Sequence, residues 1–309
     1  MRLVATLLVR DELDVLAANL EHHFAAGVDA VVVTDNGSVD GTRELLAEYT
    51  DRAPVTVIDE PAHTYRQSEW VTRMARLAVE SLGADWLVHL DADEFGWTFR
   101  PGGDRVDLDE PQDVDLAGFF ASLPAGQDVC RIRRDNMVGD LATPGSWPHR
   151  LVWRDTLALS ERGTRIGDKA AHRADPAIVV EQGNHAVSGD RAFAMTASPE
   201  LVMLHVPDRG WEHYRRKIDQ GGRSYEASGL PEEAGWHWRA DYRRLQEGSL
   251  RETWEARQHS QATLRTWAGC GRIVPDDRLL RRLDMLRATA IHPQALDAVL
   301  VAGDLDQSI

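Results

Sequence analysis

Short apolar runs alternate with amphipathic segments over the first 90 residues of the chain. The apolar runs have the length of strands that are buried on both faces, and the segments between them repeat apolar residues at helical spacing. Strands are expected at residues 2–9, 28–34, 55–59 and 86–90, and helices at residues 11–26, 43–49 and 67–82. This alternation predicts an α/β fold: an open, mostly parallel sheet flanked by helices, whose ligand site lies where the strands end.

The second half of the chain has a different pattern. Residues 101–115 are polar and rich in Gly, Pro and Asp, which predicts an excursion over the surface. Further elements are expected as a short helix at residues 116–123, strands of a mixed sheet at residues 129–132, 177–180 and 201–206, and helices from Trp211 through Leu300. We therefore divide the chain into residues 1–125 and 126–222, which form two halves of one domain, and a helical extension at residues 223–309.

Composition and charge exclude several classes of protein. The 309 residues carry a net charge of −15, which argues against a general surface for nucleic acid or anionic membranes. Cys130 and Cys270 form no metal-ligand spacing, so neither a disulfide framework nor a zinc site is expected. The apolar run at residues 3–9 is too short for a signal sequence, and no run approaches the length of a membrane span. We therefore expect a cytoplasmic protein.

Three carboxylates, Asp91, Asp93 and Glu94, follow the strand expected at residues 86–90. Because side chains alternate along a strand, Asp91 and Asp93 can point the same way, with Cα atoms roughly 6.5–7 Å apart. Such a pair at the end of a buried strand suits a hard divalent cation that bridges a phosphate. Without a cation, Asp93 would be a buried, unpaired charge. The alternative is a solvated acidic turn.

The loop at residues 35–42 follows the second expected strand and is rich in turn-forming residues. It should lie at the same edge of the sheet as Asp91, where Asp35 could accept a hydrogen bond from a nucleotide base; the alternative is a simple turn. The chain has no Gly-x-Gly-x-x-Gly opening a helix after the first strand, and no Gly-x-x-x-x-Gly-Lys-Ser/Thr. The chain therefore lacks the phosphate-binding loops that are typical of dinucleotide oxidoreductases and of P-loop proteins.

Three motifs at successive strand ends resemble those of family 2 glycosyltransferases. They are Arg10-Asp11-Glu12, Thr34-Asp35-Asn36-Gly37-Ser38-Val39-Asp40-Gly41-Thr42 and Asp91-Ala92-Asp93-Glu94-Phe95. More narrowly, the chain resembles the branch with an Asp-x-Asp-Glu-Phe motif, of which further signs are His22-His23, Gly183-Asn184-His185, and His205-Val206-Pro207 followed by a helix with Lys217. The resemblance covers about residues 3–250 and departs from the family at Asp11, where Asn is usual.

The resemblance implies a GT-A fold, in which residues 1–125 bind a nucleotide-diphosphate sugar and residues 126–222 face the acceptor. UDP is the commonest donor nucleotide in that family. The resemblance also implies Mn²⁺ or Mg²⁺ held by Asp91 and Asp93, with His205 as a further ligand unless it is a core histidine. Donor contacts are expected from Thr6, Arg10, Asp35, Asn36, Gly37, Arg73, Arg76, Asp91 and Lys169. For Arg73 and Arg76, an exposed helical arginine is the alternative.

An inverting transferase needs a general base for the acceptor hydroxyl, usually a carboxylate. Many family 2 enzymes use the Asp of a Glu-Asp pair after the central sheet, and no such pair occurs in that region here. The candidates are Glu181, His185, Asp190, Asp208 and Glu212. The acceptor is left open as a small molecule, a glycan or a lipid-linked molecule.

Two other function classes compete with a glycosyltransferase. One is a nucleotide-sugar-binding protein on a GT-A scaffold without catalysis, which the missing Glu-Asp pair favours. The other is a phosphohydrolase of the haloacid-dehalogenase type, which also carries Asp-x-Asp at a strand end. That class has its aspartate pair on an early strand, whereas the pair here follows the fourth expected strand.

Overall fold

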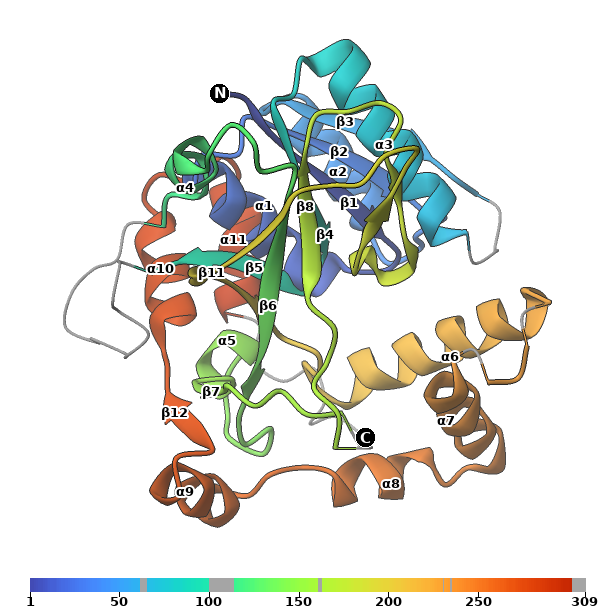
Figure 1. Cartoon of the computed structure of the whole chain (residues 1–309). Helices are drawn as coiled ribbons and strands as arrows, with labels where there is room; N and C mark the ends of the chain where they lie inside the picture. Colours follow the sequence, from blue (N-terminus) through green and yellow to red (C-terminus); the bar gives the residue numbers. More distant parts are fainter. Residues whose placement is uncertain (62–65, 100–113, 161–162, 230, 234, 302–309) are drawn as a thin grey trace.

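The computed structural model describes residues 1–61, 66–99, 114–160, 163–229, 231–233 and 235–301 (Figure 1). Almost all of the surface excursion expected at residues 101–115 lies outside these ranges. Among the described helices, none is long and apolar enough to cross a membrane.

The first half contains the four predicted strands, and all four are parallel. They are β1 (Leu3–Val9), β2 (Ala30–Asp35), β3 (Val55–Asp59) and β4 (Trp86–Asp91), in the order β3-β2-β1-β4. The register pairs Leu8 with Asp91 and Val9 with Asp35, so the carboxyl ends of the three inner strands meet at one edge of the sheet. The predicted α/β fold, with its mostly parallel central sheet flanked by helices, is confirmed.

Helices cover both faces of this sheet because its side chains alternate between two apolar clusters. Leu3, Ala5 and Leu7 of β1 pack in one cluster together with α1 (Leu13–Ala25). Val4 of the same strand packs in the other cluster with α3 (Gln67–Leu82). The helix α2 (Thr42–Thr50) adds Leu46 to the first cluster. Fully buried strands of this kind read as continuous apolar runs, which is why the sequence predicts them well.

The second half extends the sheet with mixed strand directions. β8 (Lys169–Arg173) runs antiparallel to β4 and to β6 (Val129–Val138), and β6 also pairs in parallel with β11 (Met195–His205). The remaining elements of this half are β5 (Glu94–Thr98), α4 (Leu116–Ser122), α5 (Trp147–Arg150), β7 (Trp153–Asp155), β9 (Val179–Val180), a 3-10 turn at Gln182–Asn184 and β10 (Val187–Ser188).

Several strands of this half differ from the predictions, among them β9 and β5. The strand expected at residues 177–180 shrinks to β9, which pairs with β10 outside the main sheet. Its first residues form a turn instead, because the Asp175 carboxylate and carbonyl accept from the amides of Ala177 and Ile178. β5 was not predicted, since it contains Glu94 and Gly96. It forms because it pairs antiparallel with β11.

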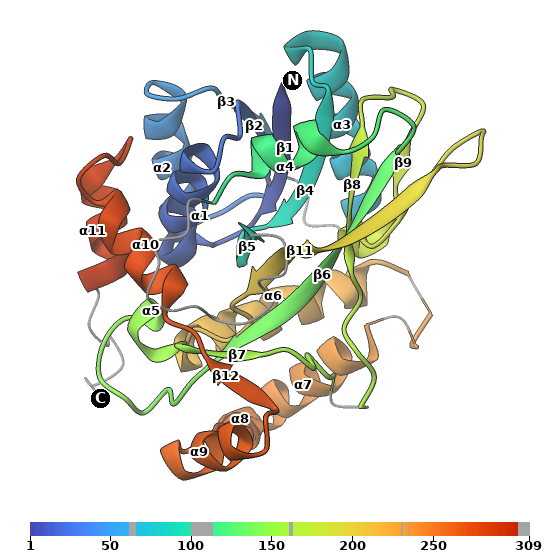
Figure 2. The same cartoon turned by 60° about the vertical axis from the view of Figure 1, so that its left-hand side comes forward.

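The C-terminal part is helical, as predicted. It comprises α6 (Trp211–Ala227), α7 (Trp236–Glu247), α8 (Leu250–Ala256), α9 (Gln261–Gly269), a short strand β12 (Ile273–Pro275), α10 (Arg278–Leu286) and α11 (Pro293–Val301). Figures 1 and 2 show that α6, α7 and α8 lie together away from β1–β4, whereas α10 and α11 return to lie beside α1. There the Glu21 carboxylate accepts hydrogen bonds from the amides of Ile291 and His292. The helix α6 continues across the division expected at residues 222 and 223.

Several buried histidines are held neutral. Burial lowers the pKa of His23 on α1 and of His172 on β8 to about 4, although backbone carbonyls oppose the shift by accepting hydrogen bonds from their rings. The unfolded chain takes up a proton near pH 6.5 and the folded chain does not. The stability that each ring contributes is therefore complete above about pH 6.5 and is lost as the pH falls toward 4.

We expect His172→Phe to reduce this pH dependence. Between about pH 6.5 and pH 4, the free energy of unfolding of the variant should fall less steeply, by up to about 1.4 kcal/mol per pH unit. Urea unfolding across this range measures the slope. Ile132→Val, a buried change on the adjacent β6, should lower stability equally at each pH. An unchanged slope in His172→Phe would show that this ring does not carry the effect.

Candidate functional site

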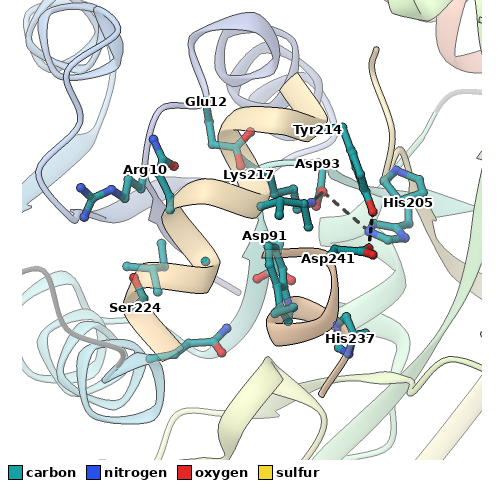
Figure 3. A pocket seen from close by; sticks show the side chains of 18 of the residues that line it. Arg10, Glu12, Asp91, Asp93, His205, Tyr214, Lys217, Ser224, His237 and Asp241 are labelled. Atoms are coloured by element: carbon teal, nitrogen blue, oxygen red, sulfur yellow. Dashed lines mark hydrogen bonds and ion pairs between the residues drawn. The ribbon is translucent and has the colours of Figure 1, made fainter. Parts of the chain in front are cut away.

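A cleft of about 910 Å³ lies where β1, β2 and β4 end, and α6 and α7 form its opposite wall (Figure 3). The predicted site residues that line it are Arg10, Asn36, Asp91, Asp93, His185 and His205. Its volume is within the range of small-molecule sites. The structure therefore brings together one residue or more from each of the three motifs that follow strands.

The turn after β1 ties the first two strand-end loops together. Arg10 donates a hydrogen bond to the Asn36 carbonyl, with its nitrogen 3.0 Å from the oxygen. Asp11 adopts a positive φ of 53°, and its carboxylate accepts from the Val39 amide at 2.6 Å and from Gln220 of α6. Asp tolerates this backbone region better than most residues. Asp11, the departure from the family pattern, thus joins both loops to the wall of the cleft.

Asp35 turns into its own loop. Its side chain is 3% exposed and accepts hydrogen bonds from the amide and hydroxyl of Ser38. Burial raises the pKa of this carboxyl, while the Ser38 bonds lower it. Asp35 is not among the residues that line the cleft, whereas its neighbour Asn36 is. A direct contact between Asp35 and a base stays a prediction.

The Asp91–Glu94 turn is fixed from α1 by a residue that sequence reasoning missed. The Asn19 amide group donates to the carbonyls of Ala92 and Glu94, at 3.0 and 2.8 Å. Glu94 is fully buried and its carboxylate accepts from the Asp91 amide at 3.2 Å. Glu94 also pairs with Arg134 at 3.1 Å. The Glu of the motif therefore holds the turn and leaves the cleft to the two aspartates.

Each motif aspartate is paired with a lysine, and these two lysines are the only ones in the chain. Lys169 Nζ lies 2.5 Å from an Asp91 oxygen, and Lys217 Nζ lies 3.0 Å from Asp93 Oδ2. The expectation that Asp93 would be an unpaired buried charge is therefore wrong. Burial raises the pKa of Asp93, but the positive charges of Lys217 and Arg209 oppose it, and the pKa is held well below its usual range.

His205 is oriented toward Asp93. Its Nδ1 lies 2.8 Å from the side-chain oxygen of Asn136 and donates to it, so in the neutral ring Nε2 carries the lone pair. That Nε2 lies 3.7 Å from Asp93 Oδ2. Two acceptor atoms at this separation suit a cation between them, and a second ring nitrogen bonded to an oxygen is typical of metal-ligating histidines. Within the described residues, no cluster of three or more potential metal ligands is found.

Of the five candidate bases, His185 is the one that lines the cleft. Glu181 contacts the Ser188 hydroxyl, and Asp190 is exposed. Glu212 is exposed and pairs with Arg215 at 3.0 Å. Asp208 is held by Trp254 at 2.7 Å, by Gln258 and by the Gly210 amide, away from the cleft lining.

The Gly183-Asn184-His185 sequence positions that histidine. The ring lies between two glycines, because a Cβ on Gly167 or on Gly183 would approach it within 2.9 Å or 2.6 Å. Asn184 donates to Asp91 at 3.3 Å, which ties the turn to the motif aspartate. Nδ1 of His185 donates to the Asp168 carbonyl at 2.7 Å, so the lone pair of the neutral ring is on Nε2. Burial lowers the pKa of His185, which favours that neutral form.

Five other predicted donor residues lie outside the cleft lining. Thr6 is buried and bonds His89 at 2.7 Å; Gly37 sits in its loop with φ 70°. Arg73 is exposed and pairs with Glu60 at 2.9 Å, and Arg76 donates to the Pro176 carbonyl at 3.2 Å. Lys169 is 1% exposed. Arg73 and Arg76 are therefore exposed arginines on a helix, which was the alternative expected for them.

Long-range contacts supply residues that no spacing in the sequence indicates. Arg209 is buried, contacts Glu12, pairs with Asp14 at 2.7 Å and lies 3.9 Å from Asp93. On the opposite wall, the Tyr214 hydroxyl donates to Asp241 at 2.5 Å (Figure 3). These pairs join residues up to 197 positions apart.

Comparison with solved structures finds weak similarities. TarS from S. aureus in complex with UDP-GlcNAc is 12% identical over 97% of this chain and 84% of that chain, with a TM-score of 0.44. TarS in complex with UDP is 10% identical over 97% and 83%, with a TM-score of 0.38. HddC from Yersinia pseudotuberculosis is 12% identical over 70% and 97%, with a TM-score of 0.36. No protein-family model and no curated protein matches the sequence. Similarities of this size identify no function.

Proposed function

We propose that the protein is a glycosyltransferase with a GT-A arrangement, which moves a sugar from a nucleotide-diphosphate donor to an acceptor hydroxyl. The observation that carries the proposal is the meeting of Arg10, Asn36 and the Asp91–Asp93 pair at one end of a parallel sheet, in a cleft of about 910 Å³. Ligands bind at this edge in open α/β sheets. The motif resemblance favours a UDP-sugar as the donor.

The pair formed by Asp93 and His205 supports the proposal of a divalent cation. Asp93 and His205 present two acceptor atoms 3.7 Å apart, and Asp91 is 35% exposed toward the same cleft. Carboxylates with one imidazole suit Mn²⁺, and also Mg²⁺ less well. When bound there, a cation would supply positive charge to the diphosphate as the glycosidic bond breaks. Asp93 and His205 are the residues we assign to hold it, and a direct bond from Asp91, whose oxygens contact Lys169 and Asn184, stays a prediction.

The remaining lining residues take the other parts of the transfer. Arg10 and Asn36 would face the donor from the β1 and β2 loops. His185 follows Asn184, which donates to Asp91, and would offer its Nε2 lone pair to the acceptor hydroxyl. A single base of this kind is what an inverting transfer needs. The wall of α6 and α7 adds Tyr214 and Trp236, which would face the acceptor.

We expect UDP to stabilise the protein, and Mn²⁺ to increase that effect. At about 100-fold excess over Kd, a ligand that binds only the folded chain adds about 2.7 kcal/mol of stability by mass action. Thermal unfolding with nucleoside diphosphates, with and without Mn²⁺, measures this. UDP-sugar incubated with the protein should also release UDP slowly through transfer to water.

The alternatives give different outcomes in the same experiment. Tight UDP binding without any release of UDP from UDP-sugars would identify a binding protein without catalysis. Release of phosphate from simple phosphate monoesters would identify a phosphohydrolase. Failure of every nucleoside diphosphate to stabilise the chain, with or without Mn²⁺, would contradict the proposed donor site.

A further inference from the structure

The two lysines of the chain both neutralise the Asp-x-Asp motif, but they do so in different surroundings. Lys169 comes from β8 and is 1% exposed, locked between Asp91 at 2.5 Å and Glu94 at 3.2 Å. Lys217 comes from α6, is 28% exposed and lines the cleft. The first pair is part of the packed sheet, whereas the second pair faces the ligand space.

Lys217 contacts the same oxygen that a cation would use. Its Nζ lies 3.0 Å from Asp93 Oδ2, and His205 Nε2 lies 3.7 Å from that oxygen. Figure 3 shows Lys217, Asp93 and His205 gathered at one side of the cleft. A cation shared by Asp93 and His205 would therefore compete with the ammonium group for one carboxylate oxygen.

The lysine side chain is suited to such an exchange. An ammonium group is a point charge with three donors on a flexible four-carbon stem, so it can turn without a fixed geometry. Lys217 opens into the cleft, and its helix is held independently by Asp11, whose carboxylate contacts Gln220. This contact of α6 does not depend on the Lys217–Asp93 pair.

We propose that Lys217 is an exchangeable counter-ion, which neutralises Asp93 in the ligand-free protein, yields that carboxylate to a divalent cation, and then faces the donor diphosphate. The last of these steps, in which Lys217 faces the donor diphosphate, rests on the proposed function. The exchange with a cation concerns the protein before any donor binds. Lys169 stays paired with Asp91 and Glu94 throughout.

The lysine content of the chain allows a direct test on the wild-type protein. With ¹⁵N-labelled lysine, the side-chain ammonium groups can give only two NMR signals, which Lys217→Met assigns by the loss of one. Addition of Mg²⁺ should shift the Lys217 signal and leave the Lys169 signal in place. Addition of UDP to the Mg²⁺-loaded protein should shift the Lys217 signal again. A Lys217 signal that does not respond to Mg²⁺ would overturn the exchange.

Calorimetric titration of donor-free protein with Mn²⁺ gives the second test. Lys217→Met and Lys217→Gln should each bind Mn²⁺ roughly 10-fold more tightly than wild type, because no ammonium competes for Asp93. The matched control is Arg215→Met, which removes one positive charge from an exposed position on the same helix. It should leave Mn²⁺ affinity unchanged. Equal tightening in the control, or none in the Lys217 variants, would overturn the proposal.

Binding of UDP at saturating Mn²⁺ separates this proposal from the proposed function. Loss of a hydrogen bond to a charged group predicts roughly 10-fold or weaker UDP binding in both Lys217 variants. UDP affinity equal to wild type would overturn the diphosphate contact. If wild type binds cations as described but never binds a nucleoside diphosphate, the proposed function fails while the counter-ion exchange stands.

Discussion

Asp93→Asn is expected to lose Mn²⁺-dependent UDP binding and UDP release from UDP-sugars, with donor affinity reduced roughly 100-fold or more. Asp93 is the carboxylate that faces His205 in the cleft, and a metal site that loses a direct ligand loses more than the 10–100-fold typical of its outer partners. Titration of UDP against Mn²⁺ measures the loss. Asp190→Asn, the same change at an exposed position, should bind UDP as wild type does.

The same substitution should lower the stability of the ligand-free chain. Relief of repulsion among Asp91, Asp93 and Glu94 would predict a rise, but the structure pairs Asp93 with Lys217 at 3.0 Å and places Arg209 3.9 Å away. Removing one partner of a buried pair leaves the other charge uncompensated, and because Lys217 keeps some contact with water we expect a loss of about 3 kcal/mol, the low end of the usual range.

A double-mutant cycle decides between these outcomes. Asp93→Asn combined with Lys217→Met should recover part of the stability that either change loses alone, because neither charge is then left without its partner. The ionised Asp93 contributes to the free energy of unfolding. This contribution is complete above the ordinary aspartate pKa and is lost as the pH falls through the lowered pKa of Asp93 in the folded chain. Urea unfolding at neutral and acid pH tests both statements. A stability gain in the single Asp93 variant would contradict the pairing.

The strands and helices of the first half follow from the sequence because their stability comes from local apolar pattern. Residues 55–59 and 67–82 form β3 and α3 with the predicted bounds. The strand β8 reads Lys-Ala-Ala-His-Arg and has no such pattern. It becomes a buried strand because Asp91 and Glu94 neutralise Lys169, and those partners come from 75 residues or more away. Periodicity cannot report a charge compensated at that distance.

The residues of the site also divide into those that the sequence predicts and those that it does not. Arg10, Asp91 and Asp93 were placed in one cleft by the rule that parallel strands end at a common edge. Asn19 and Asn136, which orient the Asp91–Glu94 turn and His205, sit within a helix and a strand and carry no motif. Their roles exist only after the chain has folded. Motif residues at strand ends were therefore predictable, and the residues that orient them were not.

His185→Gln is expected to reduce UDP release from UDP-sugars by roughly 10²–10⁴-fold, the range for loss of a general base. The reason is its position: the imidazole lines the cleft between Gly167 and Gly183, and the Asp168 carbonyl fixes the tautomer that leaves Nε2 able to take a proton. Affinity for UDP itself should change by less than about 3-fold, since the base acts on the attacking hydroxyl or water rather than on the nucleotide.

The control for this prediction is His237→Gln, which changes another exposed histidine lining the same cleft from α7. It should keep wild-type release of UDP. The pH profile adds a readout that a merely structural residue would not move. Burial lowers the pKa of His185, so activity should be level near neutral pH and fall on the acid side as the ring is protonated. That fall should be absent from the residual activity of His185→Gln. A loss of activity confined to His237→Gln would instead place the base on the α7 wall, and equal activity in both variants would remove histidine from the proton transfer.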